Sequence, residues 1–399
     1  MTWVTDWAPD RADINRCVAC GLCLPYCPTF RLTGDEAASP RGRLAAMAAV
    51  ADGIAAVDDR FEEMMGFCLQ CRACEAVCPS MVPFGKAMEG TRAELSAQRP
   101  SPQRVSRRWV FGRFIAMRWL VELATLFLAG LQRMGLGGLV SRASGLRPIR
   151  LQSGTLGRSW DPEGPPRGTV AILSGCVMDQ WFPGVHEALI GSLRMAGFRV
   201  EAPAGQGCCG ALAAHDGAAP DAARMAETNV AAFARYDWVV VDAAGCGAHM
   251  KDYGHWVDGG EDLAARVVDA TELLARLVDE GALPVLEDGR GPVAMQDPCH
   301  LRHAQRIGAE PRRLVGAAGY QPVEIDPQAL CCGAAGSYSL LHPETSAQLG
   351  RMKADQVRAS GATVVASANP GCDMQLRRHL GDEVRVAHPV ELYWEAVAP

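Results

Sequence analysis

One run of residues decides the fold of this chain: Cys17-Val18-Ala19-Cys20-Gly21-Leu22-Cys23-Leu24-Pro25-Tyr26-Cys27-Pro28. The same pattern, C-x-x-C-x-x-C-x-x-x-C-P, recurs without deviation as Cys68, Cys71, Cys74, Cys78 and Pro79. Three thiolates at i, i+3 and i+6 can wrap one face of a metal cluster, and a fourth cysteine followed by proline can start a helix that leads away. The two runs therefore predict a small helical domain built around metal.

This spacing is typical of bacterial ferredoxins with two [4Fe-4S] clusters, in which the fourth cysteine of each run ligates the other cluster. We assign Cys17, Cys20, Cys23 and Cys78 to cluster 1, and Cys68, Cys71, Cys74 and Cys27 to cluster 2. Zinc sites or an empty, degenerate fold are the alternatives. A zinc ribbon pairs two C-x-x-C knuckles and has no use for a third cysteine at i+6, so the cluster assignment is favoured.

The other eight of the sixteen cysteines form a second duplication in the C-terminal half. Adjacent cysteines on a glycine-containing loop pair with each other only under strain, but they can bridge or share metal ions. Buried structural thiols are the alternative. The pattern predicts two further metal sites, one with Cys176, Cys208, Cys209 and Cys246, the other with Cys299, Cys331, Cys332 and Cys372.

Short β-branched or apolar runs alternate with amphipathic stretches in this half. This alternation predicts βαβ units with one parallel sheet per repeat, and it places cysteines just after strands, where α/β folds hold their sites. The strands are expected at residues 169–173, 238–241, 293–295 and 363–366, and helices at 261–279 and 344–360. The fold class is a multi-domain α+β protein, an α-helical ferredoxin-type domain followed by a duplicated α/β domain, divided at 1–98, 99–168, 169–290 and 291–399.

Composition narrows the function classes. The 399 residues include 45 acidic and 39 basic side chains, a net charge of −6 that gives no global positive field for nucleic acid. Residues 1–16 lack the apolar core of a signal peptide, so a reducing cytoplasm is expected, where cysteine clusters serve metal or redox chemistry. The longest uncharged apolar run, residues 123–132, is shorter than the ~20 residues that span a bilayer. We therefore expect no membrane span.

The segment between the two cysteine groups has two parts. Residues 99–118 contain six arginines and no acid, with Trp109, Phe114 and Trp119 interleaved or adjacent, and they lead into an apolar stretch. An amphipathic helix over residues 104–131 is expected to lie at the cytoplasmic membrane surface or to cover the cluster domain. Packing against the protein's own domains is the alternative. Residues 141–168, rich in Gly, Pro, Ser and Arg, predict an extended connector.

The order of these motifs resembles the CCG, or cysteine-rich, family, found in heterodisulfide reductase, anaerobic glycerol-3-phosphate dehydrogenase and glycolate oxidase subunits. The resemblance covers nearly the whole chain and only the linker matches loosely. It rests on motifs that include Ser39-Pro40-Arg41-Gly42-Arg43, Gly207-Cys208-Cys209-Gly210-Ala211, Cys331-Cys332-Gly333-Ala334-Ala335-Gly336 and Ala368-Asn369-Pro370-Gly371-Cys372.

The resemblance implies an electron-transfer subunit that takes electrons from an FAD-containing partner oxidising a 2-hydroxy acid, glycolate to glyoxylate, and passes them to membrane quinone. Equivalent subunits for D-lactate, glycerol 3-phosphate or another 2-hydroxy acid remain alternatives, as does a scaffold whose repeats hold structural zinc. No G-x-G-x-x-G fingerprint follows a predicted strand, so we expect no flavin or nicotinamide on this chain.

One departure from the family pattern concerns the end of each repeat. The family motif closes with C-x-x-C, whereas this chain has Cys246-x-x-His249 and Cys372-x-x-Gln375. Each repeat could therefore hold a further iron-sulfur cluster, a zinc ion or no metal.

Six further residues are candidates for functional roles. His300 and His303 are potential ligands or proton carriers that favour the second repeat as the electron exit, with an ordinary helix face as the alternative. Lys251 and Lys353, two of only three lysines, could place a cation near a cluster or quinone. Arg41 and Arg43 are expected to face a cluster or the flavoprotein partner, with a solvated turn as the alternative.

Overall fold

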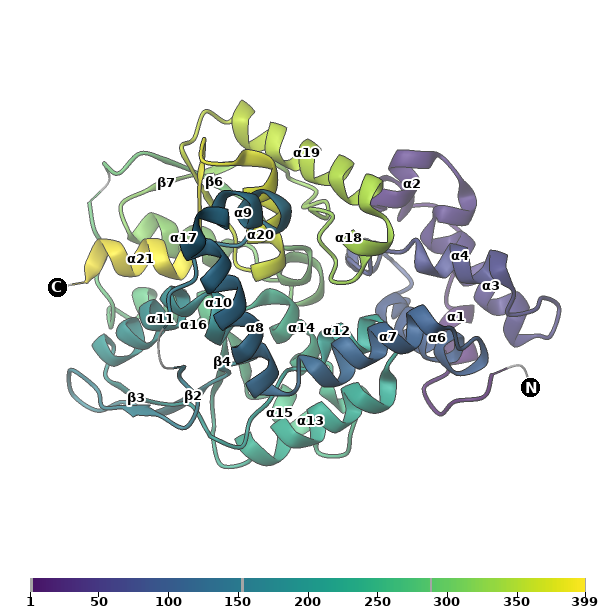
Figure 1. The fold of residues 1–399 in the computed structure, drawn as a ribbon, viewed down its shortest axis with the longest axis horizontal. Coiled ribbons are helices and arrows are strands. Elements are labelled where there is room, and N and C mark those ends of the chain that lie inside the picture. The colour runs from purple at the N-terminus through teal and green to yellow at the C-terminus, as the bar shows by residue number, and fades with distance from the viewer. Residues whose placement is uncertain (1–2, 152–153, 288, 399) are drawn as a thin grey trace.

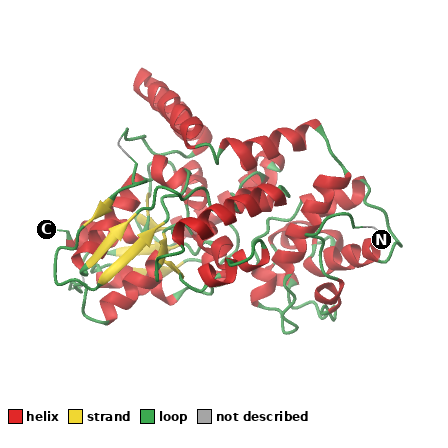
Figure 2. Ribbon diagram, turned by 90° about the horizontal axis from the view of Figure 1, so that it is seen from below, coloured by secondary structure: helices red, strands yellow, loops and turns green. Residues whose placement is uncertain are grey.

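The computed structural model describes residues 3–151, 154–287 and 289–398. Helices alone surround the N-terminus, whereas the strands are gathered in the C-terminal half (Figure 2). The predicted fold class is confirmed: a helical cluster-type domain is followed by a duplicated α/β region. In Figure 1, helix α2 (Pro28–Thr33) of the N-terminal domain lies beside α19 (Pro343–Ala359) of the second repeat, whereas the two termini lie at opposite ends of the molecule.

The N-terminal domain consists of short helices around a methionine-rich core. Met47, Met65 and Met88 are fully buried within it. Cys27 is the N-cap residue of α2, with Pro28 at its first position, as the C-P pattern predicts. After Cys78 and Pro79, by contrast, a turn comes first and α6 begins only at Phe84. The elements are α1 (Arg11–Asn15), η1 (Leu24–Tyr26), α2 (Pro28–Thr33), η2 (Glu36–Ala38), α3 (Pro40–Ala51), α4 (Asp59–Gly66), α5 (Ala73–Ala76) and α6 (Phe84–Gln98).

The expectation of one amphipathic helix over residues 104–131 is wrong, because the linker is broken at 115–117. Its elements are α7 (Pro102–Trp109), the π-helix η3 (Val110–Phe114), α8 (Arg118–Leu131), a second π-helix η4 (Gln132–Leu136) and α9 (Gly137–Ser144). No single helix in the described ranges is long and apolar enough to cross a membrane; Pro102–Phe114 and Arg118–Gly135 meet that test only as a pair bent by 100°.

The basic face of the linker packs against the protein itself. Ion pairs join Arg107 to Asp216 at 3.2 Å, Arg108 to Asp221 at 2.9 Å and Arg118 to Asp179 at 2.8 Å, and each of these acids belongs to the first repeat. The apolar side chains of Trp109, Trp119 and Phe127 are instead 51%, 59% and 66% exposed. These ion pairs therefore hold the linker against the first repeat, while the aromatic side chains of Trp109, Trp119 and Phe127 remain exposed to solvent.

Each repeat forms one parallel sheet, as predicted. The orders are β1-β3-β2-β4-β5 and β7-β6-β8-β9, so the repeats share a topology, and β1 is an added antiparallel edge strand that pairs with β3. The four predicted strands occur within one residue of the expected bounds. The strands are β1 (Ser159–Trp160), β2 (Gly168–Ile172), β3 (Phe198–Glu201), β4 (Val239–Val241), β5 (Val267–Asp269), β6 (Pro292–Met295), β7 (Gln321–Glu324), β8 (Val364–Ala366) and β9 (Arg385–Ala387).

The expected helix at 261–279 is wrong. It divides into α15 (Gly260–Ala264), strand β5 and α16 (Ala270–Asp279). The β-branched pair Val267 and Val268 is buried beside β4, and Asp269 then starts α16 through a capping box with Glu272. In the expected connector at 141–168, residues 141–144 are the end of α9, residues 159–160 form β1, and residue 168 is the first residue of β2. Residues 152–153 lie outside the described residues.

Helices cover both sheets, and the two repeats share one apolar core. Leu273 and Leu277 of α16 lie in the same cluster as Leu314 of α17 and Tyr393 of α21. The repeats are therefore held as one body. Their remaining helices are α10 (Val177–Trp181), α11 (Pro183–Met195), α12 (Ala211–His215), α13 (Ala219–Phe233), α14 (Ala244–Lys251), η5 (Tyr253–His255), the π-helix η6 (His300–Ala304), α17 (Ala309–Ala317), α18 (Tyr338–Leu341), α19 (Pro343–Ala359), α20 (Pro370–Leu380) and α21 (Pro389–Val397).

Candidate iron-sulfur centres

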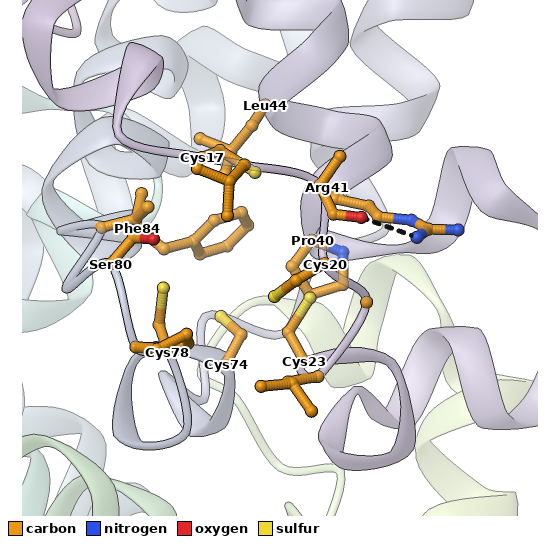
Figure 3. Close-up of a pocket in the computed structure, with 16 residues that line it drawn as sticks. Cys17, Cys20, Cys23, Pro40, Arg41, Leu44, Cys74, Cys78, Ser80 and Phe84 are labelled. Atoms are coloured by element: carbon orange, nitrogen blue, oxygen red, sulfur yellow. Dashed lines mark hydrogen bonds between the residues drawn. The ribbon is translucent and has the colours of Figure 1, made fainter.

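The cysteines assigned to cluster 1 line one pocket. Its free volume is about 440 Å³, and Leu44, Val82 and Phe84 supply apolar walls. Figure 3 shows thiols from both cysteine runs directed toward this common space. Left-handed backbone at Ala19 (φ 54°) and Gly21 (φ 84°) turns the first run sharply enough to present successive thiols to one side. The pocket thus brings together Cys17, Cys20, Cys23 and Cys78, with Cys74 also in its wall.

The cysteines assigned to cluster 2 line an adjacent pocket of about 310 Å³. Pro40, Cys74 and Phe84 contribute to both pockets, so the two sites share a wall. Burial raises the pKa of Cys74, and burial together with the neighbouring Cys299 raises that of Cys71. Buried thiols of this kind need a positive centre to become thiolates, as a metal cluster would provide. The set in this pocket is Cys27, Cys68, Cys71 and Cys74.

Arg41 and Arg43 lie in the walls of different pockets. Arg41 borders the cluster 1 pocket, where its Nη1 donates to the carbonyl of Ala19 at 3.1 Å and its Nε pairs with Glu36 at 2.7 Å. A Cβ at Gly21 would lie only 3.1 Å from Arg41 Nη1, so the glycine admits this close approach. Because Arg41 is half-exposed, it is the member of the pair that a partner protein could reach.

Arg43 is completely buried beside the cluster 2 pocket. Its guanidinium donates to the carbonyls of Met64 and Ala38 at 2.8 and 2.7 Å and to Thr29 Oγ1 at 3.3 Å. Thr29 Oγ1 in turn lies 3.2 Å from Cys27 Sγ. Arg43 therefore holds the backbone around cluster 2 in place and faces no partner protein.

The four cysteines of the first repeat lie beyond the carboxyl ends of β2, β3 and β4. Cys176 Sγ lies 3.6 Å from Cys208 Sγ, and hydrogen bonds from the Cys176 and Cys209 thiols lower the pKa of Cys208. The loop is fixed from behind, because Asn229 donates to the carbonyl of Cys208 at 3.0 Å and the Tyr253 hydroxyl donates to that of Cys209 at 2.7 Å. These hydrogen bonds thus hold the thiols of Cys208 and Cys209 in place beside each other.

The second repeat repeats this arrangement. Cys332 Sγ lies 3.2 Å from Cys372 Sγ, and hydrogen bonds from Cys331 and Cys372, with the nearby Lys353 ammonium, lower the pKa of Cys332. Lys353 is buried and forms an ion pair with Asp326. Of the two candidate lysines, Lys353 therefore lies close enough to act on a thiol electrostatically.

The other candidates have separate environments. Lys251 pairs with Glu272 at 3.3 Å, on the surface beside α16. His303 Nε2 contacts the carbonyl of Ala329 at 2.9 Å, the environment of an ordinary buried histidine. His300 Nδ1 lies 3.7 Å from Cys299 Sγ, and its ring stacks on His215. Of these three candidates, His300 alone is placed beside a cysteine.

The N-terminal domain and the second repeat meet at their cysteines. Cys71 lies in one apolar cluster with Cys299 and Cys331, together with Leu69 and Tyr338. The cluster 2 site is therefore adjacent to the site of the second repeat, and buried side chains from both domains lie between them.

The sites of the two repeats are joined through Asn369, which sequence reasoning gave no role. Its Oδ1 accepts a hydrogen bond from the backbone of Gly245 at 3.1 Å, and its Nδ2 donates to Cys372 Sγ at 3.6 Å. Gly245 immediately precedes Cys246, so one amide side chain spans the two sites. The signal was present in the sequence: Asn369-Pro370 stands where the first repeat has Ala243-Ala244.

His249 is the second residue whose surroundings were missed. It is buried, its pKa is lowered to about 4 by burial, and its Nε2 has no hydrogen-bond partner. Across the described ranges, no three or more His, Cys, Asp or Glu side chains converge on a point where one metal ion would sit. The eight cysteines of the N-terminal domain instead line two pockets, the arrangement that a multi-iron cluster requires.

Comparisons with known proteins agree with this geometry. Residues 170–251 and 293–377 match the cysteine-rich domain, and residues 13–82 match the 4Fe-4S dicluster domain. The chain is 32% identical to the probable glycolate oxidase iron-sulfur subunit of Bacillus subtilis, over 97% of this chain and 95% of that protein. It is 30% identical to the glycolate oxidase iron-sulfur subunit of Escherichia coli, over 96% and 94%. Lactate utilization protein A of Bacillus subtilis is 26% identical over 56% of this chain and 98% of that protein.

The two arginines should respond differently to substitution. Arg43→Gln is expected to lower the free energy of unfolding by about 3 kcal/mol, because the carbonyls of Met64 and Ala38 lose a buried charged donor. Iron bound per chain should fall with it. Chemical denaturation and iron analysis of anaerobically purified protein measure both quantities. Arg41→Gln is the matched control and should leave both unchanged; equal losses in the two variants would contradict the separate roles.

Proposed function

This chain belongs to the glycolate oxidase iron-sulfur subunit family, and on that basis we propose that it conducts electrons from an FAD-containing subunit that oxidises glycolate to glyoxylate to a quinone in the membrane. The observation that carries the proposal is that Cys71 lies in one apolar cluster with Cys299 and Cys331, so that the cysteine sites of separate domains are neighbours. Lactate as the oxidised hydroxy acid is the second candidate, favoured by the similarity to lactate utilization protein A.

The chain's own residues hold and insulate the redox groups. The [4Fe-4S] clusters, when bound, accept and release one electron at a time. Cys17, Cys20, Cys23 and Cys78 would hold one, and Cys27, Cys68, Cys71 and Cys74 the other. Phe84 separates the pockets with an apolar ring, and Arg43 fixes the backbone behind Cys27. The iron-sulfur centres that the CCG repeats would hold are proposed to follow these two clusters in the path of the electrons.

Electrons are proposed to enter at the cluster 1 site. Cys20 is exposed at the surface, and Val18 and Leu22, which flank it, are 69% and 56% exposed. Both side chains also line the cluster 1 pocket. A flavoprotein that covered these two apolar side chains would bring its flavin toward a ligand of cluster 1, and Arg41 would lie at the edge of that contact.

Electrons are proposed to leave from the first repeat. A cavity that opens to solvent lies between the linker and this repeat, and Cys176 and Cys208 form part of its wall. Ile115 and Val121 supply apolar surface on the opposite side, and the Arg118–Asp179 ion pair stands at its edge. A site that combines apolar side chains with polar groups such as Gln180 and Gln206 suits a quinone ring. The histidines had favoured the second repeat as the exit, but that repeat's Cys299 faces the N-terminal domain.

The linker is proposed to bring this cavity to the inner face of the cytoplasmic membrane. Its arginines are engaged by acids of the first repeat, so attraction to anionic lipid is not the main contribution. The exposed aromatic face with Trp119 and Phe127 would enter the headgroup region instead. The chain itself would remain in the cytoplasm.

Substitution of the apolar residues beside Cys20 tests the proposed entry. The double variant Val18→Glu, Leu22→Glu should slow glycolate-dependent reduction of this chain by its flavoprotein partner about tenfold, because two interface contacts worth roughly 1.4 kcal/mol together are lost. Stopped-flow bleaching of the iron-sulfur absorbance measures the rate. Val285→Glu, equally exposed at 58% but remote from the cluster 1 pocket, is the control.

The same assay decides between the candidate substrates. Reduction with glycolate but not D-lactate supports the first function, and the reverse supports the second. Reduction by neither, with both cluster sites loaded, would rule out the proposed role. An unchanged rate in the double variant with a working substrate would rule out only the docking site.

Membrane attachment is tested through the exposed aromatic face. Trp119→Ser with Phe127→Ser should move the complex from the membrane to the soluble fraction, because the apolar area that enters the headgroup region is lost. Fractionation followed by immunoblotting measures the distribution. Point variants are preferable to deletion of the segment, which would also remove the buried Val121 and the Arg118–Asp179 pair. Retention of the double variant on membranes would show that this face has no anchoring role.

A further inference from the structure

His249 has an unused nitrogen in the interior of the first repeat. Four histidines within the described ranges are more than nine-tenths buried: His186, His249, His303 and His388. The Nε2 atoms of the other three contact the carbonyls of Ser174, Ala329 and Asp242 at 2.9–3.0 Å. His249 Nε2 has no hydrogen-bond partner. Buried polar atoms almost always have a hydrogen-bond partner or bind a ligand, so His249 Nε2 is expected to have a binding partner that the protein chain itself does not supply.

The position of His249 directs this atom toward the cysteines. It follows Cys246 by three residues in α14, and residues at i and i+3 share one face of a helix. Its Nε2 lies 3.3 Å from the point that a Cβ on Gly210 would occupy, directly after the Cys208-Cys209 pair. Gly210 is in the left-handed region at φ 91°. A side chain at this position is therefore disfavoured both by the backbone conformation and by the nearby imidazole. The loop thus leaves space for an imidazole beside the two thiols.

Aromatic side chains fix the ring in this orientation. Tyr253 meets the imidazole edge-on at 5.5 Å, and Trp256 lies 5.4 Å away. The Tyr253 hydroxyl also donates to the carbonyl of Cys209. One tyrosine therefore positions both the histidine and the loop of paired cysteines, as expected of a residue that supports a metal ligand.

The equivalent position in the second repeat behaves differently. Gln375 follows Cys372 by three residues in α20, but its Nε2 donates to the carbonyl of Ser346 at 2.9 Å. A Cβ on Gly350 would lie 2.6 Å from that nitrogen, so the amide is packed against α19. The second repeat therefore satisfies this side chain within the protein.

We propose that His249 Nε2 is a metal ligand, so that the centre of the first repeat is held by Cys176, Cys208, Cys209, Cys246 and one imidazole, whereas the second repeat offers four thiolates without it. The assignment does not depend on which substrate or acceptor the complex uses. Compared with a centre closed by the C-x-x-C of the family motif, an imidazole at residue 249 replaces one thiolate, which makes the centre less negative and raises its reduction potential, as in Rieske clusters.

Pulsed EPR on the full chain, purified anaerobically with and without ¹⁵N-histidine, tests the proposal. Wild-type protein should show a strong nitrogen coupling that changes with the isotope. His249→Cys should abolish it while iron content is retained, and His249→Ala should lose the metal of the first repeat. His300→Asn and Gln375→Ala are controls that keep the coupling. If the repeat holds zinc, X-ray absorption at the zinc edge should show one nitrogen among sulfurs, lost in His249→Cys.

Several outcomes would overturn the assignment. One is metal in the first repeat with no directly bound nitrogen; another is a coupling that survives His249→Cys or disappears in His300→Asn. Iron limited to about eight per chain, the content of two cubane clusters, with no zinc, would also overturn it. Because the wild-type measurement needs no substitution, a variant that fails to fold cannot leave the question open.

Discussion

The apolar cluster that contains Cys71, Cys299 and Cys331 is the junction on which the rest of the arrangement depends. It places Cys71, a predicted ligand of cluster 2, beside the second repeat, with the apolar side chains of Leu69 and Tyr338 in the same cluster. Polar contacts reinforce it from the side of the first repeat. Arg72 pairs with Asp252, and the half-buried Arg92 donates to the carbonyl of His215 at 2.7 Å. The N-terminal domain is therefore held against both repeats, so the proposed electron transfer across this junction needs no domain motion.

Duplication gave two similar sites, and their surroundings have made them different. Cys299 and Cys331 face the N-terminal domain, whereas the equivalent Cys176 and Cys208 face the cavity under the linker. Between the repeats, Asn369 links the backbone beside Cys246 to the thiol of Cys372. Equivalent cysteines thus adjoin the N-terminal domain in one repeat and line a cavity in the other, and this difference is the basis for the proposed direction of electron flow.

The sequence predicted the parts of this molecule that depend on local pattern. Cysteine spacing predicted which thiols share a pocket, and β-branched runs predicted β2, β4, β6 and β8. It failed where tertiary contacts decide. The pattern of residues 261–279 predicts one amphipathic helix, but Val267 and Val268 are buried in a sheet whose other strands are distant in sequence. The arginines of the linker read as a free basic face, yet their acids, Asp179, Asp216 and Asp221, lie far along the chain.

The order of the sites is the central claim, and rapid freeze-quench EPR tests it most directly. The chain would be mixed with its reduced flavoprotein partner and frozen at successive times, as wild type and as Cys299→Ser. Signals of the N-terminal clusters should form first and those of the repeats later, and in Cys299→Ser the centre of the first repeat should stay oxidised while the N-terminal clusters still become reduced. If that centre were reduced as fast in Cys299→Ser as in wild type, electrons would bypass the second repeat and the proposed order would be wrong.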